Sequence, residues 1–167
     1  ILPFVLLEII VLAPVIWLTD GGPVFYNAYR AGKDYKPFKM FKLRSMYVNS
    51  PDLKNPDGST FNSENDPRVT PIGRFMRKTS LDEFPQFINV LIGDMSFIGP
   101  RPERQFYIDK IMDYDKRYSY LYQIRPGVTS YATLYNGYTD TMEKMLRRLE
   151  YDLYYLEHRS WYFDIKI

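Results

Sequence analysis

The first 18 residues form an almost unbroken apolar run, in which Glu8 is the only charged residue. As one helix this run would rise roughly 27 Å, slightly less than the ~30 Å hydrocarbon core of a bilayer. Pro14 removes a backbone hydrogen bond and predicts a bend near Ala13. The pattern therefore favours a membrane-inserted segment over residues 1–20 that bends at Pro14 and returns to the same face. A buried core helix remains an alternative, whereas a signal peptide is disfavoured because no basic residues precede the run.

The next segment replaces the continuous apolar run with alternation. Gly21-Gly22-Pro23 is typical of a turn that closes the first segment. Residues 24–29 predict a strand, and residues 36–46 alternate apolar with basic side chains. The alternation slips by one position between Met40 and Phe41, which predicts a bulged strand. Together the two segments predict a small β-hairpin with cations on one face.

Residues 48–68 are rich in Pro, Asn, Ser, Asp and Gly, and predict a long surface loop with a turn at residues 55–58. Loops of this length are usually either functional lids or disordered, and both interpretations remain open here. Residues 70–78 return to a helical pattern, with basic side chains around Ile72 and Phe75. This segment predicts an amphipathic helix with a basic face.

Two later segments predict helices. Residues 103–122 place apolar side chains at roughly helical spacing, and residues 140–158 do so more strongly. Asp140 and Glu143 stand at the spacing of a capping box ahead of the second segment. Its apolar stripe consists of Met142, Met145, Leu146, Leu149, Leu153 and Leu156. Such stripes usually face a core, although seating at a membrane interface remains an alternative for one of the two helices.

These elements predict an α+β fold class. We expect a mainly helical, membrane-associated domain with a small β-hairpin or sheet and an N-terminal re-entrant membrane helix. The membrane segment would cover residues 1–20, and residues 21–167 would form one further domain, which is large enough to bury a core. The chain begins without methionine inside an apolar run, so we expect that native residues precede it.

The composition removes several kinds of chemistry. The 167 residues carry 22 Lys and Arg against 20 Asp and Glu, and this small net charge of +2 gives no indication of nucleic-acid binding. Cysteine is absent, which excludes disulfides, thiol catalysis and cysteine metal sites. His158 is the only histidine, which excludes multi-histidine metal sites. The sequence has no Walker-type phosphate loop and no G-x-G-x-x-G motif. The remaining reactive groups are carboxylates, hydroxyls, lysines and arginines.

Two adjacent carboxylates, Asp82 and Glu83, are the strongest candidates for chemistry. A carboxylate can act as a nucleophile or bind a divalent cation. One alternative is structural, because Ser80 and Glu83 match the S-x-x-E capping box of a helix N-terminus. However, a helix capped by Ser80 would place Pro85 where a backbone N–H is needed. A helix that starts nearer Phe84 would leave both acids in the turn just before it.

Arg101 is the strongest candidate for binding an anion. It stands between Pro100 and Pro102, which fix the neighbouring backbone torsions and lower the cost of holding the guanidinium in place. A guanidinium matches the oxygens of a phosphate group. Arg125, followed by proline and glycine, repeats the arrangement more weakly. Further candidates for an anion-binding wall are Arg44, Arg74 and Arg77.

The run from residue 78 to residue 103 resembles the signature of the bacterial sugar transferase family. Members of this family are polyprenyl-phosphate sugar-1-phosphate transferases, also called monotopic phosphoglycosyl transferases. Further stretches resemble other family motifs in the expected order, so that the resemblance covers nearly the whole chain. These stretches are residues 22–25, 30–32, 39–46, 66–70, 125–129 and 161–167.

The resemblance implies a reaction and the residues that perform it. A nucleoside-diphosphate sugar, here expected to be a UDP-sugar, gives its sugar-1-phosphate to polyprenyl (undecaprenyl) phosphate and releases nucleoside monophosphate. Asp82 would be the nucleophile that forms a phosphosugar–aspartyl intermediate, Glu83 would help to hold Mg²⁺, and Arg101 would contact the phosphates. Ala13-Pro14 would break the re-entrant helix.

The resemblance also implies a location and partners. The catalytic domain, residues 21–167, would lie at the cytoplasmic face of the bacterial inner membrane, and would perform the first membrane step of surface glycan synthesis. Basic residues after the apolar segment agree with this orientation. The expected partners are the nucleotide sugar, polyprenyl phosphate and membrane lipid, without nucleic acid; homo-oligomer formation is left open.

One segment departs from the family pattern. Where many members continue with Gly-Trp/Tyr-Ala-Gln-Val-Asn-Gly-Arg, residues 130–138 read SYATLYNGY, so the sugar and nucleotide preference stays open. Two other functions remain as alternatives. A non-catalytic membrane scaffold for polysaccharide assembly would not need the acid pair. A basic nucleic-acid-binding domain would need a concentrated positive face, and it would leave the apolar segment unexplained.

Overall fold

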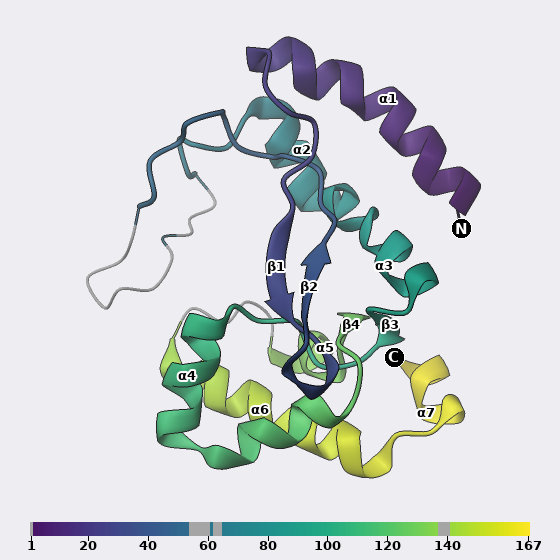
Figure 1. Ribbon diagram of the computed structural model, residues 1–167, viewed down its shortest axis with the longest axis vertical. Coiled ribbons are helices and arrows are strands. Elements are labelled where there is room, and N and C mark those ends of the chain that lie inside the picture. The colour runs from purple at the N-terminus through teal and green to yellow at the C-terminus, as the bar shows by residue number, and fades with distance from the viewer. Residues whose placement is uncertain (1, 54–60, 62–64, 137–140) are drawn as a thin grey trace. The chain divides into compact units, whose positions relative to one another are not determined.

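The computed structural model describes residues 2–53, 61, 65–136 and 141–167 (Figure 1). The chain divides into two compact units. The first unit contains Ile1–Ala28 and Phe41–Ile88, and the second contains Tyr29–Met40 and Asn89–Ile167. The predicted turn at residues 55–58 lies outside the described residues.

The first unit is built around helix α1 (Leu2–Asp20) and helix α2 (Pro71–Thr79). Its core contains Leu12 and Ile16 of α1, Leu43, and Met76 of α2. The segments between the helices contribute two isolated antiparallel pairs, Phe25 with Leu43 and Met46 with Val69. A short 3₁₀ turn, η2 (Leu81–Glu83), follows α2, and α3 (Gln86–Ile92) begins in this unit and ends in the second.

Helix α1 confirms the predicted N-terminal apolar helix. The helix is continuous through Pro14. The bend expected at that residue stays a prediction. Only Val5, Leu12 and Ile16 of its side chains are buried, and most other apolar side chains are exposed. By length and composition the helix could cross a membrane. The exposed apolar side chains do not fit the alternative of a buried core helix.

The predicted turn after this helix is confirmed at Gly21. Its backbone N–H donates to the carbonyl oxygen of Trp17 at 2.7 Å, and its φ of +70° is one that glycine adopts without strain. The predicted amphipathic helix at residues 70–78 is also confirmed as α2. The side chain of Thr70 caps it by accepting a hydrogen bond from the N–H of Gly73 at 2.9 Å.

The second unit contains two small sheets. Strands β1 (Ala28–Ala31), whose first residue belongs to the first unit, and β2 (Pro37–Met40) pair across the 3₁₀ turn η1 (Lys33–Tyr35). Strands β3 (Ser96–Ile98) and β4 (Gly127–Thr129) pair in parallel, with Ser96 opposite Gly127 and Ile98 opposite Thr129. The first pair confirms a hairpin, whereas the second pair was not predicted.

The boundaries predicted for the hairpin are wrong at both strands. The first strand is Ala28–Ala31 and not residues 24–29, because the turn at residues 33–35 sets which residues face one another. The second strand ends at Met40, where the alternation slips, and the chain then passes into the first unit. A single bulged strand over residues 36–46 is therefore replaced by β2 and the two isolated pairs of Leu43 and Met46.

The helices of the second unit enclose its main core. They are α4 (Gln105–Tyr114), the 3₁₀ helix η3 (Lys116–Gln123), α5 (Tyr131–Asn136), α6 (Met142–His158) and α7 (Trp161–Lys166). The buried core side chains are Ala31, Ile108, Ile111, Tyr118, Leu121, Tyr122 and Leu149. Most of the stripe predicted for residues 140–158 packs on this core, namely Met142, Met145, Leu146, Leu149 and Leu153.

Two expectations for these helices need correction. The single helix predicted over residues 103–122 is wrong, because α4 ends at Tyr114. Asp115 then adopts an extended conformation, and its side chain accepts a hydrogen bond from the N–H of Arg117, which starts η3. Helix α6 is capped by Thr141, whose hydroxyl accepts from the N–H of Lys144; Asp140, the predicted cap, lies outside the described residues. The described part of the chain is thus mainly helical with two small two-stranded sheets.

Candidate active site

The two adjacent acids lie in a turn between two helices. Helix α2 ends at Ser80, which adopts a left-handed conformation with φ of 58°, and η2 follows directly with Asp82 and Glu83. The Ser80 side chain makes no capping hydrogen bond to this turn. The capping-box interpretation is therefore wrong, and the acids lie just ahead of α3, as the position of Pro85 predicted.

A lysine lies between the two carboxylates. The Nζ of Lys42 is 2.8 Å from Oδ2 of Asp82 and 3.0 Å from Oε1 of Glu83. The Asp82 side chain is only 3% exposed, whereas those of Lys42 and Glu83 are 23% and 25% exposed. The cluster therefore has one almost fully buried carboxylate and an outer edge that water or a ligand can reach.

Backbone hydrogen bonds and side-chain contacts both hold this cluster in place. The N–H of Leu43 donates to the carbonyl oxygen of Asp82 at 2.9 Å. Leu43 itself is fully buried in the core of the first unit, next to Leu81 of the turn. Because side chains alternate along an extended segment, anchoring Leu43 in the core directs Lys42 to the other side. Lys42 was not among the predicted site residues, although the alternation of residues 36–46 had marked it as one of a row of cations.

The local charge of the cluster is negative. Asp82 and Glu83 supply two carboxylates, and Lys42 supplies one positive charge. With a single lysine directly between Asp82 and Glu83, the site has the charge that attracts a cation. The Asp82 carboxylate is nearly buried, its side chain contacts Lys42, and its backbone carbonyl accepts a hydrogen bond from Leu43. A carboxylate held in this way is also suited to act as a nucleophile.

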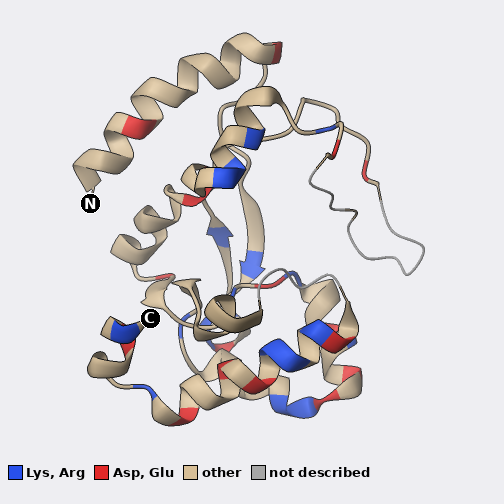
Figure 2. Cartoon of the chain, turned by 180° about the vertical axis from the view of Figure 1, so that it is seen from behind, with Lys and Arg blue, Asp and Glu red and all other residues tan. Residues whose placement is uncertain are grey.

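Three of the predicted anion-binding arginines, Arg44, Arg74 and Arg77, belong to the same unit, and Arg74 is exposed on α2. Arg44 is buried, and its Nη2 donates to Oδ1 of Asp20 at 2.5 Å and to the carbonyl oxygen of Ile16 at 3.2 Å. These two hydrogen bonds thus hold the C-terminal end of α1. Arg77 of α2 donates through Nε to Oγ of Ser45 at 2.9 Å and is partly exposed. Figure 2 shows the basic positions of α2 next to the acidic turn that follows it.

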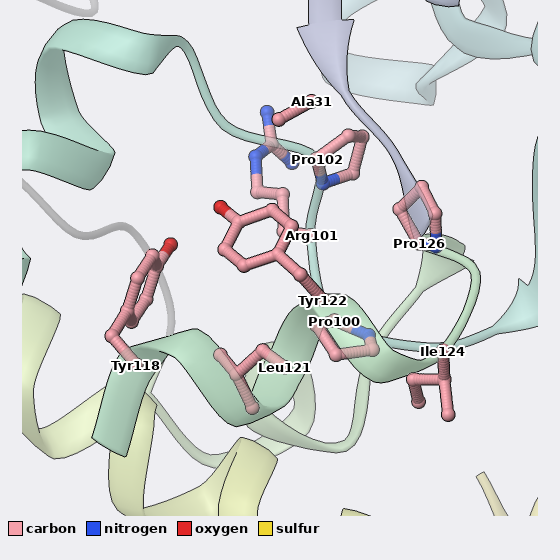
Figure 3. A pocket seen from close by; sticks show the side chains of 9 residues that line it. All are labelled: Ala31, Pro100, Arg101, Pro102, Tyr118, Leu121, Tyr122, Ile124 and Pro126. Atoms are coloured by element: carbon pink, nitrogen blue, oxygen red, sulfur yellow. The ribbon is translucent and has the colours of Figure 1, made fainter. Parts of the chain in front are cut away.

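The other two predicted arginines belong to the second unit. Arg101 is exposed and lines a shallow concavity whose walls are mainly apolar and aromatic (Figure 3). Around it lie Ala31, Pro100, Pro102, Tyr118, Leu121, Tyr122, Ile124 and Pro126. Arg125 is exposed and precedes Pro126 just ahead of β4. The two proline-containing turns are joined, because the N–H of Gly127 donates to the carbonyl oxygen of Pro100 at 3.0 Å.

The aromatic wall of this concavity carries two buried phenols. Burial raises the pKa of Tyr118 and of Tyr122 well above their usual range. Like ordinary tyrosines, both side chains are neutral near pH 7, so they add no negative charge to the wall. Tyr122 also stacks on Tyr35, with ring centroids 4.4 Å apart.

The donor set of the acidic turn fits a magnesium ion held jointly with a substrate. Within the described residues, no three side chains of the acidic, histidine or cysteine type gather as a metal cage. Mg²⁺ is usually bound by one or two carboxylates together with phosphate oxygens and water. Asp82 and Glu83 supply two adjacent carboxylates of this kind, with Glu83 on the exposed side.

Comparisons with known proteins agree with this chemistry. The family model described as Bacterial sugar transferase matches residues 1–167. A UDP-glucose:undecaprenyl-phosphate glucose-1-phosphate transferase of Escherichia coli is 44% identical over 158 residues, which are 93% of this chain and 33% of the relative. A transferase of the same name from Klebsiella pneumoniae is 42% identical over 95% of this chain and 34% of its own length.

A third relative acts on another sugar, according to its name. The UDP-N-acetylgalactosamine-undecaprenyl-phosphate N-acetylgalactosaminephosphotransferase of Aeromonas hydrophila is 38% identical over 93% of this chain and 36% of its own length. The chain thus spans about a third of the length of these three relatives.

Proposed function

Because the chain belongs to the bacterial sugar transferase family, we propose that it transfers a sugar 1-phosphate from a UDP-sugar to undecaprenyl phosphate and releases UMP. The observation that carries this proposal is the nearly buried Asp82 carboxylate beside Lys42 and Glu83, in a chain 38–44% identical to transferases named for this reaction. The sugar stays open, because the relatives are named for both glucose and N-acetylgalactosamine.

In the proposed mechanism, an Asp82 oxygen attacks the phosphorus atom that carries the sugar. The bond from this phosphorus to the oxygen of the nucleoside monophosphate breaks, and that oxygen leaves with the bonding electrons. An oxygen of undecaprenyl phosphate then attacks the same phosphorus and restores the Asp82 carboxylate. Two displacements let the soluble nucleotide leave before the lipid phosphate enters.

Lys42 would contribute to both steps as a positive charge that exchanges one anionic partner for another. In the resting site its ammonium group contacts both carboxylates. When Asp82 becomes an acyl phosphate, its carboxylate charge is lost, and the lysine can pair with phosphate oxygens instead. Such a cation stabilises the charge that spreads over the transferred phosphoryl group.

Glu83 would hold Mg²⁺ together with the diphosphate of the donor. When bound there, the ion would supply charge neutralisation on the departing phosphate. Arg101 would contact a phosphate of one substrate, and Arg44, Arg77 and Arg125 are further proposed phosphate contacts. Exchange of Arg101 for lysine keeps the charge but loses the planar fork. We expect it to reduce turnover strongly in a folded protein; near-normal turnover would contradict the role of Arg101.

We also propose that residues 1–20 enter the bilayer and bend at Pro14, so that both ends face the cytoplasm, while residues 21–167 form the catalytic domain at the cytoplasmic face of the inner membrane. The exposed apolar side chains and the length of helix α1 support this placement of residues 1–20. The chain has no cysteine, so single cysteines at positions 2 and 19 can be labelled cleanly. Periplasmic labelling of position 2 would contradict the re-entrant form. Replacement of Pro14 by leucine should favour a full span.

The central experiment separates this function from a non-catalytic scaffold. The purified protein is incubated with a panel of UDP-sugars labelled in the sugar phosphate, with and without undecaprenyl phosphate. We expect UMP release, and label on the proteolytic peptide that contains Asp82 when the lipid is omitted. An unlabelled protein that still completes transfer would indicate one direct displacement. Absence of UMP release with every donor would favour the scaffold.

A further inference from the structure

The second unit contains a buried charge cluster that the proposed mechanism does not use. The Nη2 of Arg148, in helix α6, donates to Oε1 of Glu103 at 2.7 Å, and its Nε lies 3.8 Å from Oδ2 of Asp152. The side chains of Arg148 and Asp152 are only 7% and 1% exposed. Arg148 is followed directly by the core residue Leu149. A permanently charged side chain thus occupies a position in the core.

Stability alone does not account for this arginine. Removing two charges from water is costly, and exchange of a buried ion pair for apolar residues of similar size is often neutral or stabilising. Arg148 could therefore be replaced, together with its partner, by side chains that match its apolar surroundings. What the ion pair adds is a fixed geometry, because a guanidinium binds a carboxylate in a defined orientation.

The partner of Arg148 shows what this geometry controls. Glu103 ends the turn Gly99-Pro100-Arg101-Pro102-Glu103, two residues after the exposed Arg101. The start of the turn is held by backbone hydrogen bonds from Gly99 to Thr129 and from Gly127 to Pro100. Its end is held by the N–H of Ala31, which donates to the carbonyl oxygen of Glu103 at 3.3 Å, and by the side chain of Arg148. The two prolines have no N–H with which to add further backbone bonds.

We propose that Arg148 is a positioning residue for Arg101: through Glu103 it holds the Arg101 turn, so that the Arg101 guanidinium meets a substrate phosphate in one place. This inference rests on the proposed function, because it needs Arg101 to contact a phosphate. A displacement of about 1 Å can reduce turnover by up to about 10²-fold. A loss of this kind requires no global unfolding.

The experiment is a mutant cycle on the complete chain, with kcat, KM for each substrate and thermal unfolding as measurements. The test pair is Glu103→Met with Arg148→Met, which replaces both charges by apolar side chains of similar length. We expect this pair to lower kcat/KM about tenfold, with a Tm within about 5 °C of the wild type. The methionine pair and Arg101→Ala should raise the KM for the same substrate.

The decisive comparison uses the Arg101→Ala background. There the methionine pair should change kcat/KM less than about twofold, because the residue that it positions is gone. The control is Arg117→Met, which removes an arginine that also binds two acids, Asp115 and Glu150, but is 50% exposed. The control should keep kcat/KM within about twofold of the wild type.

Several results would overturn the inference. If the methionine pair does not fold, Glu103→Gln replaces it in the same cycle, because it removes the charge and keeps the shape. An equal fold-loss with and without Arg101 would show that Arg148 acts on the structure in general, and unchanged turnover would show no action at all. Either result with an active wild type refutes only the positioning role. A wild type that releases no UMP refutes the proposed function itself.

Discussion

The cluster around Lys42 in the first unit and the cluster around Arg148 in the second both place a cation between two acidic side chains, and the two clusters differ in their access to water. In the first unit Lys42 contacts Asp82 and Glu83, and both the lysine and Glu83 are partly exposed. In the second unit Arg148 contacts Glu103 and lies near Asp152, and the arginine and Asp152 are almost fully buried. One basic and two acidic side chains are thus placed once at an accessible edge and once inside a core.

The choice of cation agrees with this difference. A lysine ammonium is compact, strongly hydrated and mobile on its stem, so it can exchange one anionic partner for another. An arginine guanidinium is planar and presents several donors in a fixed fork, which suits a partner that does not change. The comparison indicates that the first cluster is arranged for chemistry and the second for holding a fixed geometry.

The largest expected effect follows from removing the nucleophile. Asp82→Asn keeps the shape of the side chain but cannot form an acyl phosphate, so we expect overall transfer and UMP release without lipid to fall by roughly 10⁴-fold or more. Glu83→Gln should slow both steps and regain part of its rate at high Mg²⁺. Initial rates of UMP release over a Mg²⁺ series measure both effects. Equal residual activity in the two variants would contradict the separate roles of the two acids.

A pair of matched substitutions tests the comparison itself. Arg148→Met leaves the buried cluster without its cation, and we expect it to lower the free energy of unfolding by about 3 kcal/mol. Lys42→Met acts at a partly exposed site and should cost less than about 1 kcal/mol, while lowering turnover by about 10²-fold. Denaturant unfolding and UMP release, measured on both variants, give the two rankings. A ranking in which Lys42→Met is the more destabilising variant would contradict the division into chemistry and fixed geometry.

The parts of the fold that could be predicted from the sequence depend on local patterns. The apolar run gives α1, the 3.6-residue period gives α2 and α6, and Pro85 moves the start of α3 beyond the acid pair. The parallel pair of β3 and β4 could not be predicted. Each strand has three residues, and Ser96 and its partner Gly127 are far apart in the sequence. Such a pair depends on tertiary contacts that no local period records.

The candidate site divides in the same way. Asp82, Glu83 and Arg101 were found because their neighbours in sequence are distinctive. Lys42 and Arg148 were missed, because Lys42 meets Glu83, and Arg148 meets Glu103, across more than 40 residues of sequence. Arg148 and Asp152 are spaced four residues apart on α6, and in the sequence they resemble an ordinary solvent-exposed pair. Only the structure shows that this side of the helix is buried.

The smallest expected effect concerns the proton on Asp152. Burial raises the pKa of this carboxyl to about 7, although the nearby Arg148 opposes the shift. Glu103 and Tyr118 also face the cluster. The protonated form is therefore favoured in the folded protein, whereas the unfolded chain ionises near the ordinary value of 3.8. Since the unfolded state then binds fewer protons, the contribution of Asp152 to stability is fully present below pH 3.8 and is lost as the pH rises to about 7.

Asp152→Asn removes this dependence, because an amide resembles the protonated carboxyl and does not titrate. We expect the stability of the variant relative to that of the wild type to increase between pH 5 and pH 7. The difference between their free energies of unfolding (variant minus wild type) should rise by about 2 kcal/mol. Denaturant unfolding of both proteins at several pH values gives this difference, and the contributions of groups present in both proteins cancel in it. Parallel curves for the two proteins would mean that Asp152 is ionised in the folded state. In that case the buried cluster would bind its cation through two charged carboxylates, as the accessible cluster does, and the two would differ in exposure alone.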